Sequence, residues 1–434
     1  WKYARRTMEP VRLTQFSPGA GCGCKISPAQ LRQILQESLP GRPKKDLESK
    51  GNSAREQGAN VAGLDKGPGN QRAAEADLSK GAIEFPQLLV GYESCDDAAV
   101  YDIGSGKAVI STTDFFTPIV DDPYDFGRIA ATNAISDIYA MGGTPLMAIS
   151  ILGWPLEKLP AAVAGKVIEG ARTICSQAGI PLAGGHSISI SEPVFGLAVT
   201  GIIDKELVRR NNSVQKGDYL FLTKPLGIGL ISTGIKRGIA LQEHMETALR
   251  LMTRLNAEGP RLALLPGVHA LTDVTGFGLL GHCLEMVEGS GLTARIRVDD
   301  VPLIPGIDFY VKENCIPGGT YRNYDSYGHR LAFSAADNTV IVGIPESGTR
   351  QDATLPDAAQ KTVTAGFLKA AKLPDTAQKT ESAGIPEGIT LPDPVKLVLC
   401  DPQTSGGLLI AAHPDSRIVL EKEYGAVCVG EIVI

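Results

Sequence analysis

Short hydrophobic runs alternate with helical patterns along most of the chain. Runs rich in β-branched residues are typical of buried strands, and they fall at 108–111, 146–152, 195–203 and 219–223. Apolar side chains spaced three and four residues apart predict helices over 28–39, 126–141, 160–178 and 247–264. Strands and helices interleaved in this way predict an α/β (α+β) fold with two domains.

Two segments lack this pattern. From 41 to 84 the few large apolar residues are too scattered to offset the entropy cost of ordering the chain. From 343 to 394 a Leu-Pro-Asp tripeptide recurs at 355, 373 and 391, which is typical of low complexity rather than of a stacked repeat. We therefore predict a flexible N-terminal segment over 1–40, low-complexity inserts over 41–84 and 343–394, and α/β domains over 85–208 and 209–434.

Composition and charge narrow the class of protein. Of the 434 residues, 43% are hydrophobic and 21% charged, which is typical of a soluble globular protein. The 48 acidic residues outnumber the 42 basic ones, so no overall basic character points to a nucleic acid partner. No apolar run reaches the roughly 18 residues of a membrane-spanning helix. Eight cysteines are too sparse for a secreted disulfide scaffold, so we expect a cytoplasmic enzyme without a membrane partner.

A glycine-rich segment near the N-terminus carries a candidate nucleophile. Cys22 and Cys24 lie among glycines and are followed by Lys25, Ser27 and Pro28, the last two being typical of a helix start. The positive end of that helix and the Lys25 ammonium would both favour a thiolate at either cysteine. Two other interpretations stay open: a flexible loop with inert thiols, or half of a metal site, although the chain has no second Cys pair at zinc spacing.

Acidic residues flank the apparent strands and one helix of the first half. Asp96 and Asp97 precede one apolar run and Asp114 follows another, while Asn133 and Asp137 share one face of a predicted helix. Carboxylates in apolar surroundings need cations. Oxygen ligands in this number suit Mg²⁺, which in turn suits a polyphosphate. The alternative is that these residues are separate turn and cap residues.

Two glycine-containing turns carry polar side chains. In the first, Gly184 and Gly185 precede His186 and Ser187, and bare backbone amides of this kind can meet phosphate or a base. By itself His186 is more typical of a hydrogen-bonded structural histidine than of a catalyst. The second is Asp-Pro-Gln-Thr-Ser-Gly-Gly at 401–407, which is more typical of a structural turn than of a functional site.

A third glycine pattern favours a different class of enzyme. The pattern G-x-G-x-x-G at 276–281 follows a possible strand over 269–274, as in the dinucleotide-binding fold of nicotinamide or flavin oxidoreductases. Thr272 and Asp273 stand where that fold needs apolar packing. The other interpretation places Asp273 with the acidic residues of the first half. Because no G-x-x-x-x-G-K-[ST] pattern occurs, any ATP site must use another scaffold.

Motifs spread over the whole chain closely resemble those of the selenophosphate synthetases (selenide, water dikinases). The opening residues 13–16 and 19–25 are followed, in family order, by 96–101, 111–116, 131–137, 183–187, 272–282 and 401–407. The resemblance covers about 11–39, 85–334 and 397–434, so the two low-complexity segments are departures from the family pattern.

The resemblance implies synthesis of selenophosphate, AMP and phosphate from ATP, selenide and water, which supplies selenium for selenocysteine. It also implies Mg²⁺ and K⁺ as cofactors, and a fold like that of aminoimidazole ribonucleotide synthetase whose N-terminal sheets pair across a homodimer. Two alternatives stay open: a related ATP-dependent synthetase or small-molecule kinase of the same fold, and a relative with a non-catalytic binding role.

The family's functional positions carry over residue by residue. Cys22 matches the essential thiol, and Lys25 matches the lysine that contacts the ATP phosphates. The metal-binding carboxylates match Asp97, Asp114, Asp137 and Asp273. The positions around the nucleotide match Lys25, Ser94, Cys95, Asp96, Asp114, Asn133, Asp137, Gly185, His186 and Ser187.

Overall fold

The computed structural model describes residues 11–17, 19, 21–26, 30, 34, 85–91, 96–334, 336–344 and 394–434. The insert predicted over 41–84, nearly all of the insert over 343–394 and most of the helix predicted over 28–39 lie outside the described residues. The chain divides into two compact units, 1–28 with 87–434, and 29–86. Both sheets described below belong to the first unit.

The first sheet confirms the strands predicted at 108–111, 146–152 and 195–203. Its described strands are β1 (Leu88–Val90), β2 (Ala99–Gly104), β3 (Lys107–Phe116), β4 (Thr144–Trp154), β5 (Leu182–Ser189) and β6 (Val194–Asp204). Their order across the sheet is β1-β2-β3-β6-β4-β5. Neighbours pair antiparallel except β4 and β5, which run parallel.

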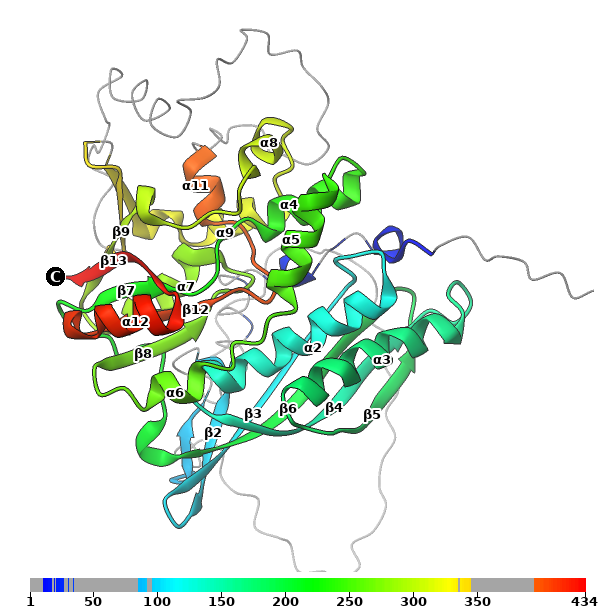
Figure 1. Cartoon of the computed structure of the whole chain (residues 1–434), viewed down its shortest axis with the longest axis horizontal. Helices are drawn as coiled ribbons and strands as arrows, with labels where there is room; N and C mark the ends of the chain where they lie inside the picture. The colour runs from blue at the N-terminus through cyan, green and yellow to red at the C-terminus, as the bar shows by residue number, and fades with distance from the viewer. Residues whose placement is uncertain are drawn as a thin grey trace, which may run out of the picture. The chain divides into compact units, whose positions relative to one another are not determined.

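Two helices cover one face of this sheet (Figure 1). They confirm the helices predicted over 126–141 and 160–178, and they are α2 (Pro123–Ala140) and α3 (Ala161–Gln177). Asp122 caps α2, since its side chain accepts the backbone N–H of Asp125 at 2.8 Å. The opposite face of the sheet carries no described helix.

Helix α2 is enclosed on all sides over most of its length. Every residue from Ile129 to Ala140 is buried, because α3 and the first sheet cover part of the helix and strand β8 (Val268–Asp273) of the second sheet contacts another part. The approach of α3 is close, since a side chain at Gly127 would lie 1.8 Å from the carbonyl oxygen of Val167. A helix buried all round carries its polar side chains into the interior.

The second sheet is antiparallel at every pairing between its described strands. In sheet order these are β10 (Leu331–Ser334), β11 (Thr339–Val342), β9 (Thr293–Arg297), β13 (Val427–Val433), β7 (Tyr219–Leu222), β12 (Leu408–Ala412) and β8. Strand β7 confirms the run predicted at 219–223. Together the two sheets and their helices confirm the mixed fold predicted from the sequence.

This arrangement contradicts the dinucleotide-binding interpretation of residues 276–281. The strand before the glycine pattern is β8, which stands at an edge and pairs antiparallel with β12. A dinucleotide-binding fold places that strand inside a parallel sheet. Helix α7 (Gly278–Val287) does start within the pattern. The glycines therefore open a helix without forming the βαβ unit that holds a dinucleotide.

The single helix predicted over 247–264 is wrong. The chain leaves α5 (Gln242–Met252) and begins α6 at Gly259, because Asn256 between them is buried. Its amide nitrogen donates to Ser136 Oγ at 2.8 Å and to the Gly406 carbonyl at 2.9 Å, contacts that a continuous helix would lose. The other described helices of this half are α4 (Ile228–Arg237), α6 (Gly259–Ala263), α8 (Ile307–Lys312), α9 (Gly318–Tyr327), α11 (Pro394–Leu399) and α12 (Arg417–Tyr424).

Short 3-10 turns complete the described elements. They are η1 (Leu13–Phe16), η2 (Gly21–Cys24), η3 (Lys205–Leu207), η4 (Val298–Asp300), η5 (Gly328–Arg330) and η6 (Pro414–Ser416). Within the described ranges, no helix has the length and apolar character needed to cross a membrane.

Candidate active site

Side chains from separate parts of the chain meet where α2 passes between the two sheets. On β3, alternate residues face the helix, and Asp114 occupies one of these inward positions. On α2, two polar residues one turn apart point the same way. The group comprises Cys22 of η2, Lys25 just after it, Asp97 before β2, Asp114 of β3, Asn133 and Asp137 of α2, and Asp273 at the end of β8.

A chain of hydrogen bonds joins the thiol to the amine. The Cys22 thiol donates to Asn133 Oδ1 at 3.3 Å, and the Asn133 amide nitrogen donates to Asp114 Oδ2 at 2.6 Å. Lys25 Nζ contacts the same carboxylate oxygen at 3.1 Å. Burial by itself lowers the pKa of Lys25, but attraction by Asp114, and then by Cys22, raises it well above its ordinary value. Lys25 is therefore a cation at neutral pH.

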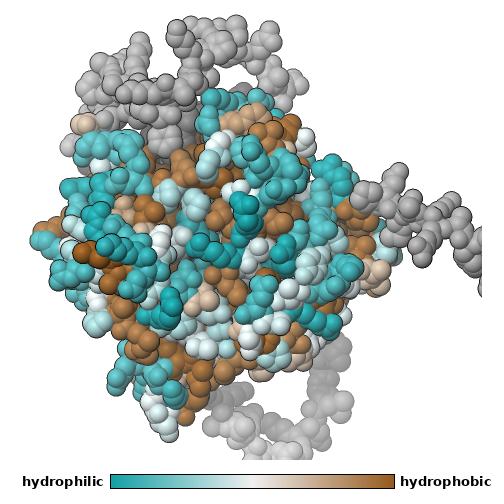
Figure 2. Space-filling model, in the orientation of Figure 1, coloured by the Kyte–Doolittle hydropathy of each residue, from teal (hydrophilic) through white to brown (hydrophobic). Residues whose placement is uncertain are grey.

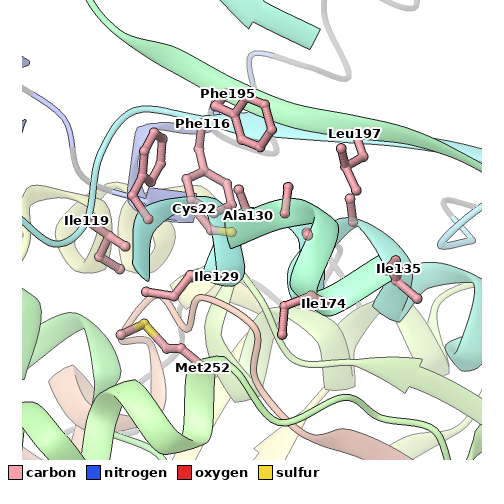
Figure 3. Packing of buried hydrophobic residues seen from close by; sticks show 14 of the residues in the cluster. Cys22, Phe116, Ile119, Ile129, Ala130, Ile135, Ile174, Phe195, Leu197 and Met252 are labelled. Atoms are coloured by element: carbon pink, nitrogen blue, oxygen red, sulfur yellow. The ribbon is translucent and has the colours of Figure 1, made fainter. Parts of the chain in front are cut away.

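Cys22 is fully enclosed. Its backbone N–H donates to Thr404 Oγ1 at 3.1 Å, and its side chain is 0% exposed. Gly21 just before it has φ +51°, and a side chain there would lie 2.5 Å from the same threonine hydroxyl, so this position needs glycine. Figure 3 shows the cysteine packed between the first sheet and α2, among residues that include Phe116, Ile129 and Ala130.

Three further carboxylates lie buried beside this chain of hydrogen bonds. Burial raises the pKa of Asp97 and of Asp137 well above the ordinary value, and repulsion by Asp273 raises both further. Burial also raises the pKa of Asp273. Thr272 donates to Asp97 at 2.9 Å and Thr112 donates to Asp137 at 2.5 Å. Without a cation, these carboxylates destabilise one another.

The donor set fits a divalent cation that prefers oxygen ligands. Asp97 Oδ2 and Asp273 Oδ2 are buried, and neither accepts a hydrogen bond within the described part of the chain. Such orphaned carboxylate oxygens are costly unless a cation or a proton satisfies them. As the side chains stand, no three His, Cys, Asp or Glu residues in the described ranges are close enough to enclose one metal ion.

Some predicted site residues are not part of this cluster. Ser94 and Cys95 lie outside the described residues. Asp96 accepts the backbone N–H of Asn211 at 2.8 Å, so its carboxylate ties the segment before β2 to the segment after β6. Its predicted place beside a nucleotide stays a prediction.

The predicted residues Gly185, His186 and Ser187 lie on β5, three positions from β3 in the sheet order. All three are exposed. A side chain at Gly185 would lie 2.2 Å from the Ser150 carbonyl oxygen, so glycine is required for β5 to pair with β4 at this point. The motif lies apart from the cluster within the described residues, and its role in nucleotide binding stays a prediction.

Residues that lie in the quoted motifs but were assigned no site role from the sequence hold the cluster in place. The backbone N–H of Ser405 donates to Asn133 Oδ1 at 2.8 Å, and the Thr404 hydroxyl accepts the N–H of Cys22. Both belong to the turn at 401–407, whose composition signals a turn but not its partners. Thr112 and Thr272 are strand residues whose hydroxyls meet carboxylates, and a hydrophobicity pattern treats such positions as ordinary strand.

The fold and the site define a class of protein. The model of the AIR synthase related protein N-terminal domain matches residues 95–203, and that of the C-terminal domain matches 215–316. Thiamine-monophosphate kinase from Stenotrophomonas maltophilia has a similar fold, with a TM-score of 0.50 and 16% sequence identity over 81% of this chain and 90% of that one. The chain thus contains the N- and C-terminal domains of AIR synthase related proteins, which confirms the predicted fold class.

Relatives narrow the class to one family. A selenide, water dikinase from Aeromonas hydrophila is 45% identical over 413 residues, which are 95% of this chain and 91% of that protein. Another, from Photorhabdus laumondii, is 50% identical over 349 residues, which are 80% of this chain and 89% of that protein. The chain belongs to the selenide, water dikinase family, and the resemblance seen in its motifs is confirmed.

Proposed function

We propose that the cluster around Cys22, Lys25 and Asp114 is the centre at which this chain makes selenophosphate from ATP, selenide and water. AMP and phosphate are the other products, so both phosphoanhydride bonds of ATP are opened. One observation carries the assignment of residues: the hydrogen-bonded chain from thiol to amine stands beside three buried carboxylates. A nucleophile, a cation and a set of metal ligands are the parts that such a reaction needs.

Lys25 is proposed to hold the ATP phosphates. Its raised pKa keeps the ammonium charged, and 35% of its side chain is exposed, so one side remains open to an anionic ligand. Asp114 anchors the other side at 3.1 Å. A cation held in this way needs little reorganisation when negative charge develops on the phosphate oxygens.

Four aspartates are proposed to hold Mg²⁺: Asp97, Asp114, Asp137 and Asp273. When bound, Mg²⁺ neutralises phosphate charge and stabilises the charge that develops as the phosphoanhydride bonds break. The buried, unpartnered oxygens of Asp97 and Asp273 support this assignment, because a cation would satisfy both. K⁺ is proposed as a second cofactor on the family resemblance, and no described residue is assigned to it.

Cys22 is proposed to act on the selenium substrate. We propose that the thiol, whose proton is held by Asn133 Oδ1, holds or shields selenide until selenide itself attacks the phosphoryl group of ATP. Because the side chain is 0% exposed, the segment that carries it must also move to admit selenide. Opening and closing of this segment would keep an oxidisable substrate away from solvent.

We propose that two copies pair through the open face of the first sheet. Exposed apolar residues cluster on that face, and they include Tyr101, Phe115, Met147, Ile149 and Ile188. In Figure 2 hydrophobic residues lie along the lower edge of the molecule, at the place where Figure 1 shows β2. An apolar sheet face of this kind is typical of a protein interface. Ile149→Lys should yield monomers in sedimentation, and an unchanged sedimentation coefficient would remove this face from the interface.

A reducing compartment, the cytoplasm, suits this chemistry. Six cysteines of the described residues are buried and form no disulfide with one another. Free thiols and selenide both survive where thiols stay reduced.

The deciding experiment measures AMP formed by the full chain, with and without selenide and with and without Mg²⁺. We expect AMP only when ATP, selenide and Mg²⁺ are all present. AMP formation that does not depend on selenide would favour a related ATP-dependent synthetase or kinase of the same fold.

A further inference from the structure

A buried lysine outside the proposed catalytic groups anchors the turn that holds Asn133. Lys224 follows β7 and is 2% exposed. Its Nζ donates to the carbonyl oxygen of Arg254 at 2.7 Å and to that of Ser405 at 2.9 Å. These two carbonyls belong to segments far apart in the sequence, so one amine ties both of them to the second sheet.

The peptide at Ser405 is fixed in a conformation that serine rarely adopts. Its φ is +52°, in the left-handed region, which is strained for a residue with a side chain. The hydroxyl donates to the Ile129 carbonyl at 3.2 Å. The next residue leaves no room for a shift, because a side chain at Gly406 would lie 1.9 Å from the Val274 carbonyl oxygen. The surrounding contacts therefore hold this peptide in place.

The orientation of the Asn133 amide follows from that peptide. A backbone N–H can only donate, so Ser405 N–H must face Asn133 Oδ1, which it meets at 2.8 Å. The amide nitrogen then faces Asp114, and Oδ1 also accepts the Cys22 thiol. If the amide turned over, it would present a donor to the Ser405 N–H, so that bond would be lost, and an oxygen acceptor to the Asp114 carboxylate.

Stability alone does not account for a lysine at this position. Burial, and then the nearby charge of Arg254, lowers the pKa of Lys224 to about 7. An apolar side chain of similar length would avoid the cost of burying an ammonium group. The lysine is therefore retained at a cost to folding, in a place where its two hydrogen bonds set the geometry of the site.

We infer that Lys224 is a positioning residue for the Cys22–Asn133–Asp114 chain and acts through the backbone of Ser405. Among the described residues, its side chain donates only to the carbonyl oxygens of Arg254 and Ser405 and to none of the proposed reacting groups, so its effect passes through one peptide to one amide. The inference rests on the proposed roles of Cys22 and Asn133.

The first test needs neither ATP nor selenide. Alkylation of Cys22 by iodoacetamide, followed by mass spectrometry of its peptide, should be about tenfold faster in Lys224→Met than in the unaltered chain, because the thiol loses its acceptor. In the turnover assay, kcat should fall about 10- to 100-fold while the KM for ATP stays within about twofold, as for a misplaced catalytic group. Lys166→Met, at an exposed lysine paired with Glu169 on α3, is the matched control and should change neither.

Two further variants separate positioning from a general structural role. Ser405→Gly suits the positive φ and keeps the backbone donor and acceptor, so it should fold even if Lys224→Met does not. It frees the peptide and should shift alkylation and kcat in the same direction by less. In an Asn133→Ala background, Lys224→Met should have no further effect on alkylation. Unchanged alkylation in both single variants, or additive effects in the double variant, would overturn the inference.

The alkylation result stands apart from the proposed reaction. If the chain lacks selenide-dependent AMP formation yet Lys224→Met accelerates alkylation of Cys22, the proposed reaction fails and the positioning role survives. If turnover is selenide-dependent and alkylation is unaffected by either substitution, the proposed reaction survives and the positioning role fails.

Discussion

The two halves of the chain build the site in different ways. The first half supplies most of the charge and the reactive atom, in Cys22, Lys25, Asp114 and Asp137. The second half supplies Asp273 and otherwise neutral groups, among them the Thr272 hydroxyl and the Ser405 N–H. The difference indicates that chemistry and alignment are divided between the halves, and that substitutions in each half should fail in distinct ways.

The largest effect should come from the reactive atom of the first half. Cys22→Ser should lower selenide-dependent AMP formation by about 1,000-fold or more, because a hydroxyl cannot replace the soft, polarizable sulfur that is proposed to hold selenide. ATP binding, measured by calorimetry, should stay within about twofold. Cys175→Ser, in α3 and outside the cluster, is the control and should retain turnover. Full turnover in Cys22→Ser would remove the thiol from the mechanism.

A smaller effect, expected from both halves alike, should come from the proposed metal ligands. Asp137→Asn and Asp273→Asn should each raise the Mg²⁺ concentration needed for half-maximal turnover, by about 10- to 100-fold. Each should also raise Tm in the absence of Mg²⁺, since one of the mutually repelling buried carboxylates is gone. If Asp273→Asn, and not Asp137→Asn, showed the same Mg²⁺ titration as the unaltered chain, the metal site would lie in the first half alone.

The smallest effect should be a pH dependence that belongs to the second half. The folded chain lowers the pKa of Lys224 to about 7 from 10.5, so between these values the unfolded chain binds more protons and the contribution of this residue to stability rises with pH. The contribution of Lys224 to the free energy of unfolding changes by at most about 1.4 kcal/mol per pH unit. Lys224→Met lacks this pH dependence, so the free energy of unfolding of the variant relative to the unaltered chain should be highest at or below pH 7 and should fall as the pH rises. Urea unfolding at several pH values measures the difference, and parallel curves would contradict the lowered pKa.

Local patterns predicted the fold well where neighbours in sequence decide the structure. The runs within β3, β4, β6 and β7 and the helices α2 and α3 follow from periodicity and turn residues. The break between α5 and α6 did not, because it depends on Asn256 reaching Ser136 and Gly406 across the interior. Tertiary hydrogen bonds of this kind produce no periodic pattern in the amino-acid sequence.

The site was predicted to a similar extent and with a similar limit. Family motifs pointed to Cys22, Lys25 and five aspartates. The structure brings these side chains together except for Asp96, which contacts Asn211, and the roles of all of them stay predictions. Nothing in the sequence marks Lys224, a single lysine after an apolar strand, as a buried anchor. The exposed position of His186 within the described chain also lay beyond sequence patterns, because it depends on the order of strands in the sheet.

Helix α2 has a consequence for how this chain can vary. From Ile129 to Ala140 it offers almost no surface to solvent, and a single added carbon at Gly127 would collide with α3. A library that randomises this helix should therefore lose nearly every member, including those that alter no proposed ligand. The room for mutational drift lies elsewhere, and any redesign of the enzyme would do best to leave these turns untouched.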